Sequence, residues 1–485
     1  MIIALTENSR EYANIIFHII RIFIPTLTWD DFLNNTSDKA ILLEIKVNNE
    51  KIYCTLKDNC SFKFDINDGN GEINKAVKIG VYKLLASFLK YKNSPWGILT
   101  GIRPTKIVHR LWDQGLNTAE IYSVLKKEYL LSDEKIENLI EITSFQRNNL
   151  LIHKEAKVNV SIYISIPFCP SKCSYCSFPS YIISKWENKL ETYLDCLIKE
   201  IIQVGEALKN NNIVVQTVYI GGGTPSVLTH KQLNRLLKVI NSALITNKTI
   251  EFTLEAGRPD TIDKKKLEIL KELGVNRISI NPQTMVDKTL NEIGRNHTSN
   301  EVIEIFRLAK KIGFEIINMD IILGLPGEDI DSLRYTLDEI SKLRPNNVTV
   351  HVLSLKRSSK YDLGLLENSN ENLIAEMLEV TKQKMYDNGL IPYYLYRQRQ
   401  MIANLENIGY CEYDYPCIYN IQMIEERQTI WGLGVGATSK VLLNDEYALE
   451  NQNNPKDLFY YIENIDEVIT EKVKAIYKLY RREIK

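Results

Sequence analysis

The chain has 485 residues, a formal net charge of −1 and 25% charged residues. This length is too great for a single hydrophobic core, so two or three domains are expected. The near-zero net charge gives no bulk attraction to nucleic acid or to an anionic membrane, and neither is expected as a partner. The apolar run over residues 13–25 is short and contains His18 and Arg21. It therefore predicts a core helix of a cytoplasmic protein rather than a signal peptide or a membrane span.

Residues 1–153 are predicted to form an α+β accessory domain. Within it, Arg103 and Lys106 lie in the segment WGILTGIRPTKIVHR, where they could hold a ligand carboxylate or simply belong to a structural turn. The predicted elements are a strand, a helix, the two strands of a hairpin and three helices, over residues 2–5, 11–23, 40–47, 51–56, 76–89, 104–112 and from residue 132 onward.

Residues 154–356 show strands that alternate with amphipathic helices, which is typical of βα units and a parallel sheet. Six such units predict an open, partial (β/α)6 barrel of the TIM type, with its chemistry at the carboxyl ends of the strands. The six strands are predicted over residues 162–167, 217–221, 251–256, 277–282, 316–324 and 348–353. Helix starts are predicted at three capping boxes, Ser184 with Glu187, Thr229 with Gln232 and Thr298 with Glu301.

The first barrel strand is followed by a loop that contains Cys169, Cys173 and Cys176 in the spacing C-x3-C-x2-C. Three thiolates can hold three irons of a cubane [4Fe–4S] cluster and leave the fourth iron open, whereas such clusters usually have four cysteine ligands. A zinc knuckle or an unrelated cysteine loop is the alternative. The remaining five cysteines are predicted to be buried free thiols: Cys54, Cys60, Cys196, Cys411 and Cys417.

Three other strand ends carry polar or glycine signals. The second strand leads into the glycine run Gly221–Gly223 and then Thr224 and Pro225, where the missing side chains let the backbone approach a ligand closely. The third strand ends at Glu255, in LEAGRPD, and the fifth contains Asp320, in NMDIILGLPGE. A buried carboxylate is costly without a partner, so a ligand or a cation is expected beside Asp320.

Taken together, the cysteine loop and the GGGTP segment resemble those of the radical S-adenosylmethionine (radical SAM) enzymes. The resemblance implies a [4Fe–4S] cluster held by Cys169, Cys173 and Cys176, with SAM chelated by the open iron. It further implies that an electron from the cluster cleaves SAM to methionine and a 5′-deoxyadenosyl radical. An electron donor such as flavodoxin or ferredoxin is then expected as a partner.

More closely, the chain resembles the oxygen-independent coproporphyrinogen III oxidase family, and within it the HemZ branch. The general resemblance covers residues 156–440, and the phrases LTGIRPTK, LEAGRPD, SINPQTM and PYYLYRQRQ resemble that branch. It implies a tetrapyrrole substrate and the oxidative decarboxylation of coproporphyrinogen III propionates to vinyl groups, giving protoporphyrinogen IX. It also implies SAM contacts from Tyr163, Gly222 and Glu255, a cavity lined by Gln283, Arg295 and Asp320, and second-SAM positions at Tyr175, Gly223 and Thr224.

Two positions depart from the family pattern. Phe178 stands where the oxidase proper has a further cysteine, and Tyr419-Asn420 stands where a related haem-chaperone branch has a His-Asn pair. The first departure weakens the oxidase assignment and the second weakens the chaperone assignment. Two alternatives follow: a haem-binding or haem-delivery protein that retains the cluster, and a radical SAM enzyme with another substrate.

Residues 357–485 are predicted to form a mixed C-terminal extension like that of the oxidase family. Its predicted elements are a helix over residues 371–388, an aromatic and basic strand over residues 393–399 and a helix over residues 455–482. Arg397 and Arg399 would pair with the propionates of a tetrapyrrole, because aromatic faces and guanidinium groups suit such a ligand. A solvated edge strand is the alternative.

Overall fold

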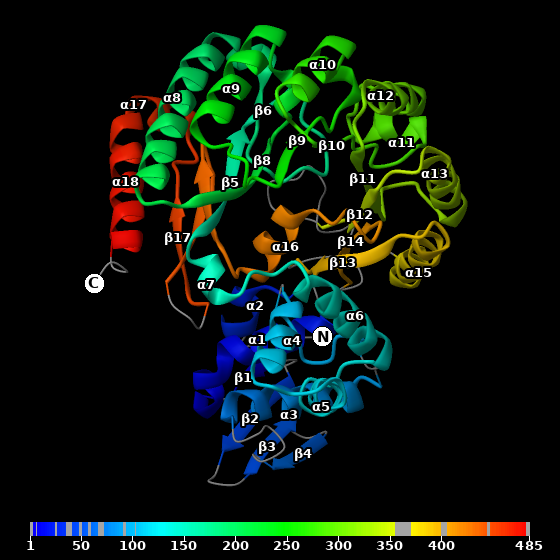
Figure 1. Cartoon of the computed structure of the whole chain (residues 1–485). Coiled ribbons are helices and arrows are strands. Elements are labelled where there is room, and N and C mark those ends of the chain that lie inside the picture. The colour runs from blue at the N-terminus through cyan, green and yellow to red at the C-terminus, as the bar shows by residue number, and fades with distance from the viewer. Residues whose placement is uncertain are drawn as a thin grey trace. The chain divides into compact units, whose positions relative to one another are not determined.

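The computed structural model divides into two compact units (Figure 1). The first unit comprises residues 1–144, 363–369 and 396–400, and the second comprises residues 145–362, 370–395 and 401–485. The three-part division with boundaries at residues 153 and 356 stays a prediction. The structure describes residues 3–5, 7–24, 27–34, 41–47, 51–56, 60–65, 72–90, 94–101, 103–354, 370–398, 405–443 and 447–481.

The first unit contains a four-stranded sheet in the order β1-β2-β3-β4. Its strands are β1 (Ile3–Leu5), β2 (Ile41–Val47), β3 (Lys51–Leu56) and β4 (Cys60–Asp65). β1 runs parallel to β2, whereas β2 with β3 and β3 with β4 are antiparallel. The predicted hairpin is confirmed, and β4 is an additional strand that the sequence reasoning missed.

The helices of the first unit supply most of its core. Buried residues of α1 (Ala13–Phe23) and α3 (Ile73–Phe88) form one cluster with alternate residues of β2 and β3, as expected when one face of a sheet is covered. The other helices in this part of the chain are η1 (Glu7–Tyr12), α2 (Trp29–Asn34), α4 (Thr105–Asp113), α5 (Thr118–Glu128) and α6 (Asp133–Arg147).

The second unit is built on an eleven-stranded sheet in the order β13-β14-β12-β11-β10-β9-β8-β5-β15-β16-β17. Its centre consists of the six predicted strands, all parallel. The described strands leave this sheet open, as predicted for a partial barrel. The six strands are β5 (Asn159–Ile166), β8 (Val214–Gly222), β9 (Glu251–Glu255), β10 (Arg277–Ser279), β11 (Ile316–Leu323) and β12 (Asn347–Val352).

Helices follow the strands and lie along one face of the sheet in Figure 1. Their order is α8 (Ile183–Asn210), α9 (His230–Ala243), α10 (Lys264–Glu272), α11 (Asp287–Glu292), α12 (Ser299–Ile312), α13 (Ile330–Leu343) and α15 (Glu371–Asp387). The capping boxes at Thr229 and Thr298 are confirmed. The box at Ser184 is wrong, because α8 begins one residue earlier and its N-cap, Ile182, has no side chain that could accept a hydrogen bond.

The C-terminal segment extends both edges of the sheet. β13 (Ile391–Tyr396) and β14 (Asn407–Cys411) lie beyond β12, while β15 (Thr429–Leu433), β16 (Thr438–Leu442) and β17 (Leu449–Asn453) lie beyond β5. β15 is parallel to β5. The predicted terminal helix consists of two helices, α17 (Leu458–Glu463) and α18 (Ile465–Arg481), and α16 (Ile418–Glu425) precedes β15.

A buried ion pair fastens α18 to this edge of the sheet. Lys472 on α18 contacts the carboxylate of Glu200 on α8 at 2.5 Å, and Tyr461 and Asn454 also donate to that carboxylate. Burial alone would raise the pKa of Glu200, but the lysine and these hydrogen bonds lower it. The backbone N–H of Gly434, in the turn after β15, donates to Glu200 at 2.8 Å. The end of the chain is thus tied to β15 through a satisfied network.

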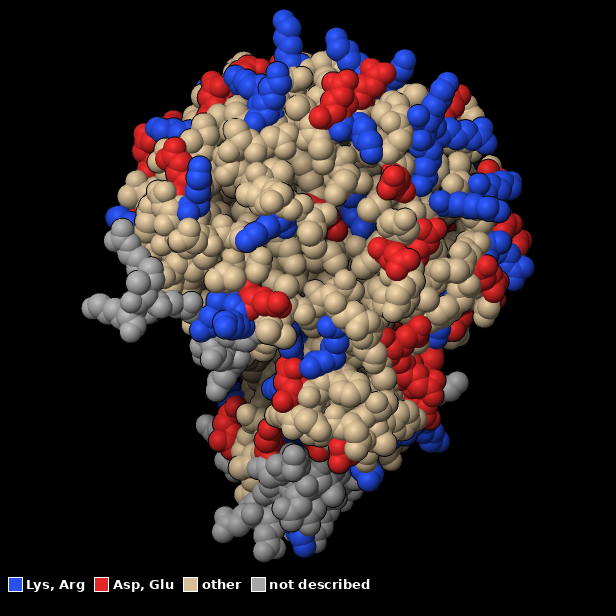
Figure 2. All heavy atoms as spheres, in the orientation of Figure 1, with Lys and Arg blue, Asp and Glu red and all other residues tan. Residues whose placement is uncertain are grey.

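The face of the second unit that Figure 2 shows carries charges of both signs. On the face of the second unit in Figure 2, basic and acidic side chains alternate around a rim and other residues fill the centre, which agrees with the net charge of −1. In the described part of the chain, every helix is too short or too polar to cross a membrane.

Candidate functional site

The cysteine loop begins directly after β5. Two short strands, β6 (Phe168–Cys169) and β7 (Tyr181–Ile182), pair with each other and bring the two ends of the loop together. Within the loop, the backbone N–H of Cys176 donates to the carbonyl of Cys173 at 3.2 Å. The paired strands and this hydrogen bond thus hold the three predicted cysteines within one short loop.

Each of the three sulfurs has a hydrogen-bond donor close by. The hydroxyl of Thr224 lies 3.5 Å from the sulfur of Cys169, and an Nη atom of Arg258 lies 3.9 Å from that of Cys173. The backbone N–H of Phe178 donates to Cys176. Donors directed at sulfur stabilise the thiolate, which is the form that binds metal.

Burial raises the pKa of the Cys169 and Cys176 thiols, but coordination deprotonates a thiol outright. Among the described residues, no group of three cysteine, histidine or acidic side chains is close enough together to hold a single metal ion. This does not conflict with a cubane cluster, because each thiolate there binds a different iron. Cys54, Cys196, Cys411 and Cys417 are free thiols; the first and the last two are buried as predicted, whereas Cys196 is half-buried. The prediction for Cys60 falls on a side chain outside those that the structure describes.

The glycine segment lies against this loop. Gly222 has φ +109°, and a β-carbon there would lie 3.0 Å from the hydroxyl of Ser165. A β-carbon on Gly223 would lie only 2.5 Å from the carbonyl oxygen of Phe168. The backbone N–H groups of Gly223 and Thr224 donate to Ile166 and Phe168, both at 2.8 Å. Glycine is therefore required here for the approach of two backbones as well as for any ligand.

Glu255 lies at the carboxyl end of β9 and faces a group of stacked tyrosines. The hydroxyl of Tyr219 donates to its carboxylate at 2.6 Å. The ring of Tyr219 stacks on that of Tyr419 with centroids 4.5 Å apart, and Tyr163 lies 6.4 Å and 6.2 Å from these two rings. Burial raises the pKa of Glu255 to about 7, and the Asp320 carboxylate adds to the rise. The Tyr219 hydroxyl and the backbone N–H of Gly222 oppose this rise in pKa, but no lysine or arginine among the described residues forms an ion pair with this half-buried carboxylate.

Asp320 on β11 and Gln283 after β10 meet at the same sheet edge. The backbone N–H of Gln283 donates to the carbonyl of Asp320 at 2.9 Å, and Gln283 has φ +70°. Its side-chain oxygen is buried and has no hydrogen-bond partner. The Asp320 carboxylate accepts from Asn318 at 2.7 Å and lies 3.8 Å from His351 on β12. A strained, unsatisfied glutamine of this kind is typical of a ligand site.

Arg295 and Tyr175 connect the cysteine loop to the third and fourth strands. One Nη atom of Arg295 donates to the carbonyls of Gly257 at 3.0 Å and Asn281 at 2.7 Å. The other Nη atom donates to the hydroxyl of Tyr175 at 3.0 Å. Arg295 is 7% exposed. Burial works against its charge, yet Tyr175 and Cys173 keep its pKa above the ordinary value. The guanidinium is thus a fixed positive charge beside the loop.

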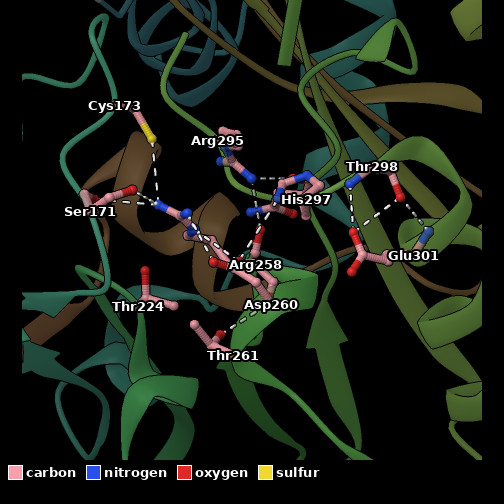
Figure 3. A network of polar contacts seen from close by, with 12 residues as sticks. Ser171, Cys173, Thr224, Arg258, Asp260, Thr261, Arg295, His297, Thr298 and Glu301 are labelled. Carbon is pink, nitrogen blue, oxygen red and sulfur yellow. Dashed lines mark hydrogen bonds and ion pairs between the residues drawn. The ribbon is translucent and has the colours of Figure 1, made fainter. Parts of the chain in front are cut away.

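The sequence reasoning missed two further residues of the site, Arg258 and Asp260 (Figure 3). They follow Glu255 in the segment LEAGRPD, which was singled out for its glutamate alone. Arg258 is 3% exposed and forms a two-point ion pair with Asp260. His297 lies beside them, and burial lowers its pKa to about 4. An arginine so close after a strand end was the available signal.

The arginines predicted to bind the substrate are Arg397 and Arg399. Arg397 belongs to the first unit, where its guanidinium donates to the carbonyl of Leu99 at 2.5 Å and lies over the Trp96 ring at 4.9 Å. Its side chain is 4% exposed, so it packs in the fold instead of presenting an open cationic surface. Arg399 lies outside the described residues. Arg103 and Lys106 are half-buried at the start of α4.

A cavity of about 180 Å³ lies at the opposite end of the strands. Its wall includes Glu251 and Arg277, the first residues of β9 and β10, and Pro416 and Ile418. The polar side chains here are engaged with the protein itself: Arg277 donates to the carbonyl of Pro416 at 2.7 Å, and Glu251 accepts from the backbone N–H of Ile418 at 2.8 Å. We therefore place the candidate site at the carboxyl ends of the strands.

Comparison with known proteins defines the class. Residues 163–340 match the Radical SAM superfamily. The crystal structure of coproporphyrinogen III oxidase (HemN) from Escherichia coli has a TM-score of 0.51 to this structure, covering 65% of this chain and 72% of that one at 21% sequence identity. This similarity establishes the radical SAM fold.

The particular family follows from sequence identity. The chain is 42% identical to the oxygen-independent coproporphyrinogen-III oxidase-like protein HemZ of Bacillus subtilis (strain 168), over 80% of this chain and 78% of that protein. It is also 37% identical to the heme chaperone HemW of the same organism, over 48% of this chain and 62% of that protein. The chain belongs to the HemZ family of radical SAM proteins. The resemblance drawn from the sequence is thus confirmed.

Radical SAM proteins bind a [4Fe–4S] cluster and SAM, and the residues present fit both groups. Three thiols lie in one turn, each with a donor near its sulfur. Beside them, the poorly compensated Glu255 and Gln283 offer polar atoms to a charged ligand.

Proposed function

We propose that this chain is a radical SAM enzyme that acts on a reduced tetrapyrrole, with its cluster held by Cys169, Cys173 and Cys176. The observation that carries the proposal is the convergence of three thiols, each with its own donor, beside the carboxyl ends of β8 and β9. When bound, the cluster and SAM supply the radical chemistry, and the protein supplies orientation and excludes water.

We assign SAM to the space in front of Gly222, Glu255 and Tyr163. The glycine lets a ligand approach the backbone, and the carboxylate can accept from an amino or hydroxyl group. Arg295 and Asp320 bound this space with opposite charges. The full set of proposed cofactor-binding residues is Tyr163, Tyr175, Gly222, Gly223, Thr224, Glu255, Gln283, Arg295 and Asp320.

The reaction we propose is the oxidative decarboxylation of coproporphyrinogen III propionates to vinyl groups, which gives protoporphyrinogen IX. Membership of the HemZ family supports this substrate class. Cleavage of SAM needs a one-electron donor, for which a small flavodoxin or ferredoxin is the proposed partner, and the substrate radical must then give one electron to a separate acceptor as carbon dioxide leaves. We also propose a cytoplasmic location, because thiols remain reduced there.

The second candidate is a haem-binding or haem-delivery protein, which the identity with HemW supports. Tyr419, at the place where the chaperone branch carries histidine, is 4% exposed and stacks on Tyr219. It offers no imidazole to a haem iron. Of the two candidates, this observation favours the enzyme.

The test is product analysis under anaerobic conditions with coproporphyrinogen III, SAM and a chemical reductant. Protoporphyrinogen IX and carbon dioxide are expected from the wild-type protein, and neither from Cys173→Ala. Stoichiometric haem binding with no SAM cleavage would support haem delivery instead. SAM cleavage that coproporphyrinogen III does not change would indicate another substrate.

A further inference from the structure

We propose that Arg258 is a positioning residue that anchors the cysteine loop to the end of β9 and raises the reduction potential of the cluster. The inference rests on the proposed function, because it takes Cys173 to be a cluster ligand. It concerns a residue outside the set proposed for SAM and substrate.

The guanidinium of Arg258 reaches into the middle of the loop (Figure 3). One Nη atom donates to the hydroxyl of Ser171 at 2.9 Å and to its backbone carbonyl at 3.3 Å. The same atom lies 3.9 Å from the sulfur of Cys173. At this distance the full positive charge acts on the sulfur even though the hydrogen bond is long.

The other edge of the guanidinium is fixed by Asp260. Its Nε and second Nη atoms each lie 3.1 Å from a different oxygen of that carboxylate. Arg258 is 3% exposed, and the side chain of Asp260 is 20% exposed although the residue as a whole lies at the surface. A planar, two-point pair in a buried place holds the arginine in one orientation, which a lysine could not reproduce.

The turn that carries this pair is itself bound to the turn after β8. The hydroxyl of Thr261 donates to the carbonyl of Arg258 at 2.8 Å and lies 2.5 Å from the hydroxyl of Ser226. Lys266 donates to the carbonyls of Ser226 and Thr261, both at 2.7 Å. Ser226 lies in η3 (Pro225–Val227), directly after Thr224.

One hydrogen-bond network therefore contacts two of the three thiols. Thr224 approaches Cys169 from the turn after β8, and Arg258 approaches Cys173 from the turn after β9. Hydrogen bonds and charge around the sulfurs set the potential of an iron–sulfur cluster. Because reduction adds a negative charge, the arginine favours the reduced state and raises the potential, whereas Asp260 opposes it.

The test uses the full chain, reconstituted anaerobically with iron and sulfide, and compares Arg258→Gln with the wild-type protein. Two quantities are measured, the midpoint potential from a spectroscopic redox titration and the rate at which a chelator removes iron. For Arg258→Gln we expect a lower potential, with the one-electron equilibrium shifted about tenfold, or about 59 mV. We also expect iron loss to be several-fold faster, because Ser171 loses its anchor.

Asp260→Asn provides an independent variant of similar shape. It loosens the same anchor, so iron loss is again expected to accelerate, but it removes a negative charge and should raise the potential. Arg277→Gln is the matched control, because it removes another buried arginine, at the amino end of β10. In that variant both the potential and the rate of iron loss should equal those of the wild-type protein.

The outcomes separate this inference from the proposed function. A wild-type protein that binds no four-iron cluster would overturn the proposed function. If the wild-type protein does bind the cluster, an unchanged midpoint potential and an unchanged rate of iron loss in Arg258→Gln would overturn the role of Arg258 alone. If Arg258→Gln does not fold, the result for Asp260→Asn decides. A midpoint potential below that of the wild-type protein, or an unchanged rate of iron loss, would then overturn the role of Arg258.

Discussion

The two ends of β9 carry the same side chain in different surroundings. Glu251 begins the strand and accepts from the backbone N–H groups of Ile418 at 2.8 Å and Tyr419 at 3.0 Å, and it lies 3.4 Å from Nε of Arg277. Glu255 ends the strand and accepts from the Tyr219 hydroxyl, and its pKa is raised to about 7 by burial.

We interpret Glu251 as a structural carboxylate, whereas Glu255 is the one that we propose to contact SAM. At the amino end of the strand the charge is matched by an arginine and by backbone donors, so folding alone satisfies it. At the carboxyl end, the cost of burying the Glu255 charge exceeds what its hydrogen bonds offset, and a bound ligand can supply the missing interaction. Substitutions at the two ends should therefore affect different measurements.

The largest effect is expected from Cys173→Ala, beside the carboxyl ends of the strands. Loss of one of three thiolates should abolish the four-iron cluster and all SAM cleavage, because no spare cysteine stands in this loop. Iron and sulfide analysis after anaerobic reconstitution measures this, with Cys196→Ala on α8 as a control. A full cluster in Cys173→Ala would remove the assignment.

At the amino end, Arg277→Gln should reduce the free energy of unfolding by about 3–5 kcal/mol, because it leaves Glu251 buried without its cation. Arg277 also donates to Asn347 and to the carbonyls of Tyr415 and Pro416. Chemical denaturation of the apoprotein measures the loss. Iron content and SAM affinity of the reconstituted protein should stay unchanged, and a selective loss of SAM affinity would contradict the division of roles.

Glu255→Ala should produce the converse result. Hydrogen bonds to charged groups contribute about 1.5–3 kcal/mol, so SAM affinity should fall roughly ten- to a hundredfold. Calorimetric titration of SAM into the reconstituted protein measures it. Iron content serves as the control and should equal that of the wild-type protein, and an unaltered SAM affinity would make Glu255 structural.

The last prediction concerns pH. Because the pKa of Glu255 is higher in the folded protein than the ordinary value of 4.5, the folded state holds this proton more tightly than the unfolded state does. The contribution of protonated Glu255 to the free energy of unfolding is therefore fully present below pH 4.5. It is lost as the pH rises toward 7, by at most about 1.4 kcal/mol per pH unit. Glu255→Gln should therefore gain stability relative to wild type over this range. Denaturation at several pH values measures the difference, and a constant difference would refute the raised pKa.

The sequence predicted the barrel well because each βα unit is local. β9 was expected over residues 251–256 and spans Glu251–Glu255, since its apolar run has clear boundaries. β15 was missed because its pairing is distant: Trp431 lies opposite Ile162 in β5, and neither segment indicates the other.

The candidate site shows the same limit. The three cysteines and Glu255 belong to recognisable motifs, and the structure brings them to one end of the sheet. Arg258 was overlooked although it belongs to the LEAGRPD segment, because its partner Ser171 precedes it by 87 residues. Tyr219 was likewise missed, because its contacts with Glu255 and Tyr419 join residues far apart in the sequence and leave no local pattern.

The buried pair between Glu200 and Lys472 has a consequence for the order of synthesis. Glu200 leaves the ribosome long before the lysine that compensates its charge, and β15, which completes the side of β5, also comes late. Until α18 emerges, a nascent chain carries an uncompensated carboxylate beside its first barrel strand. Such distant pairings delay folding, so the barrel edge next to the cysteine loop should stay unfinished until the residues of β15 and α18 have been synthesised.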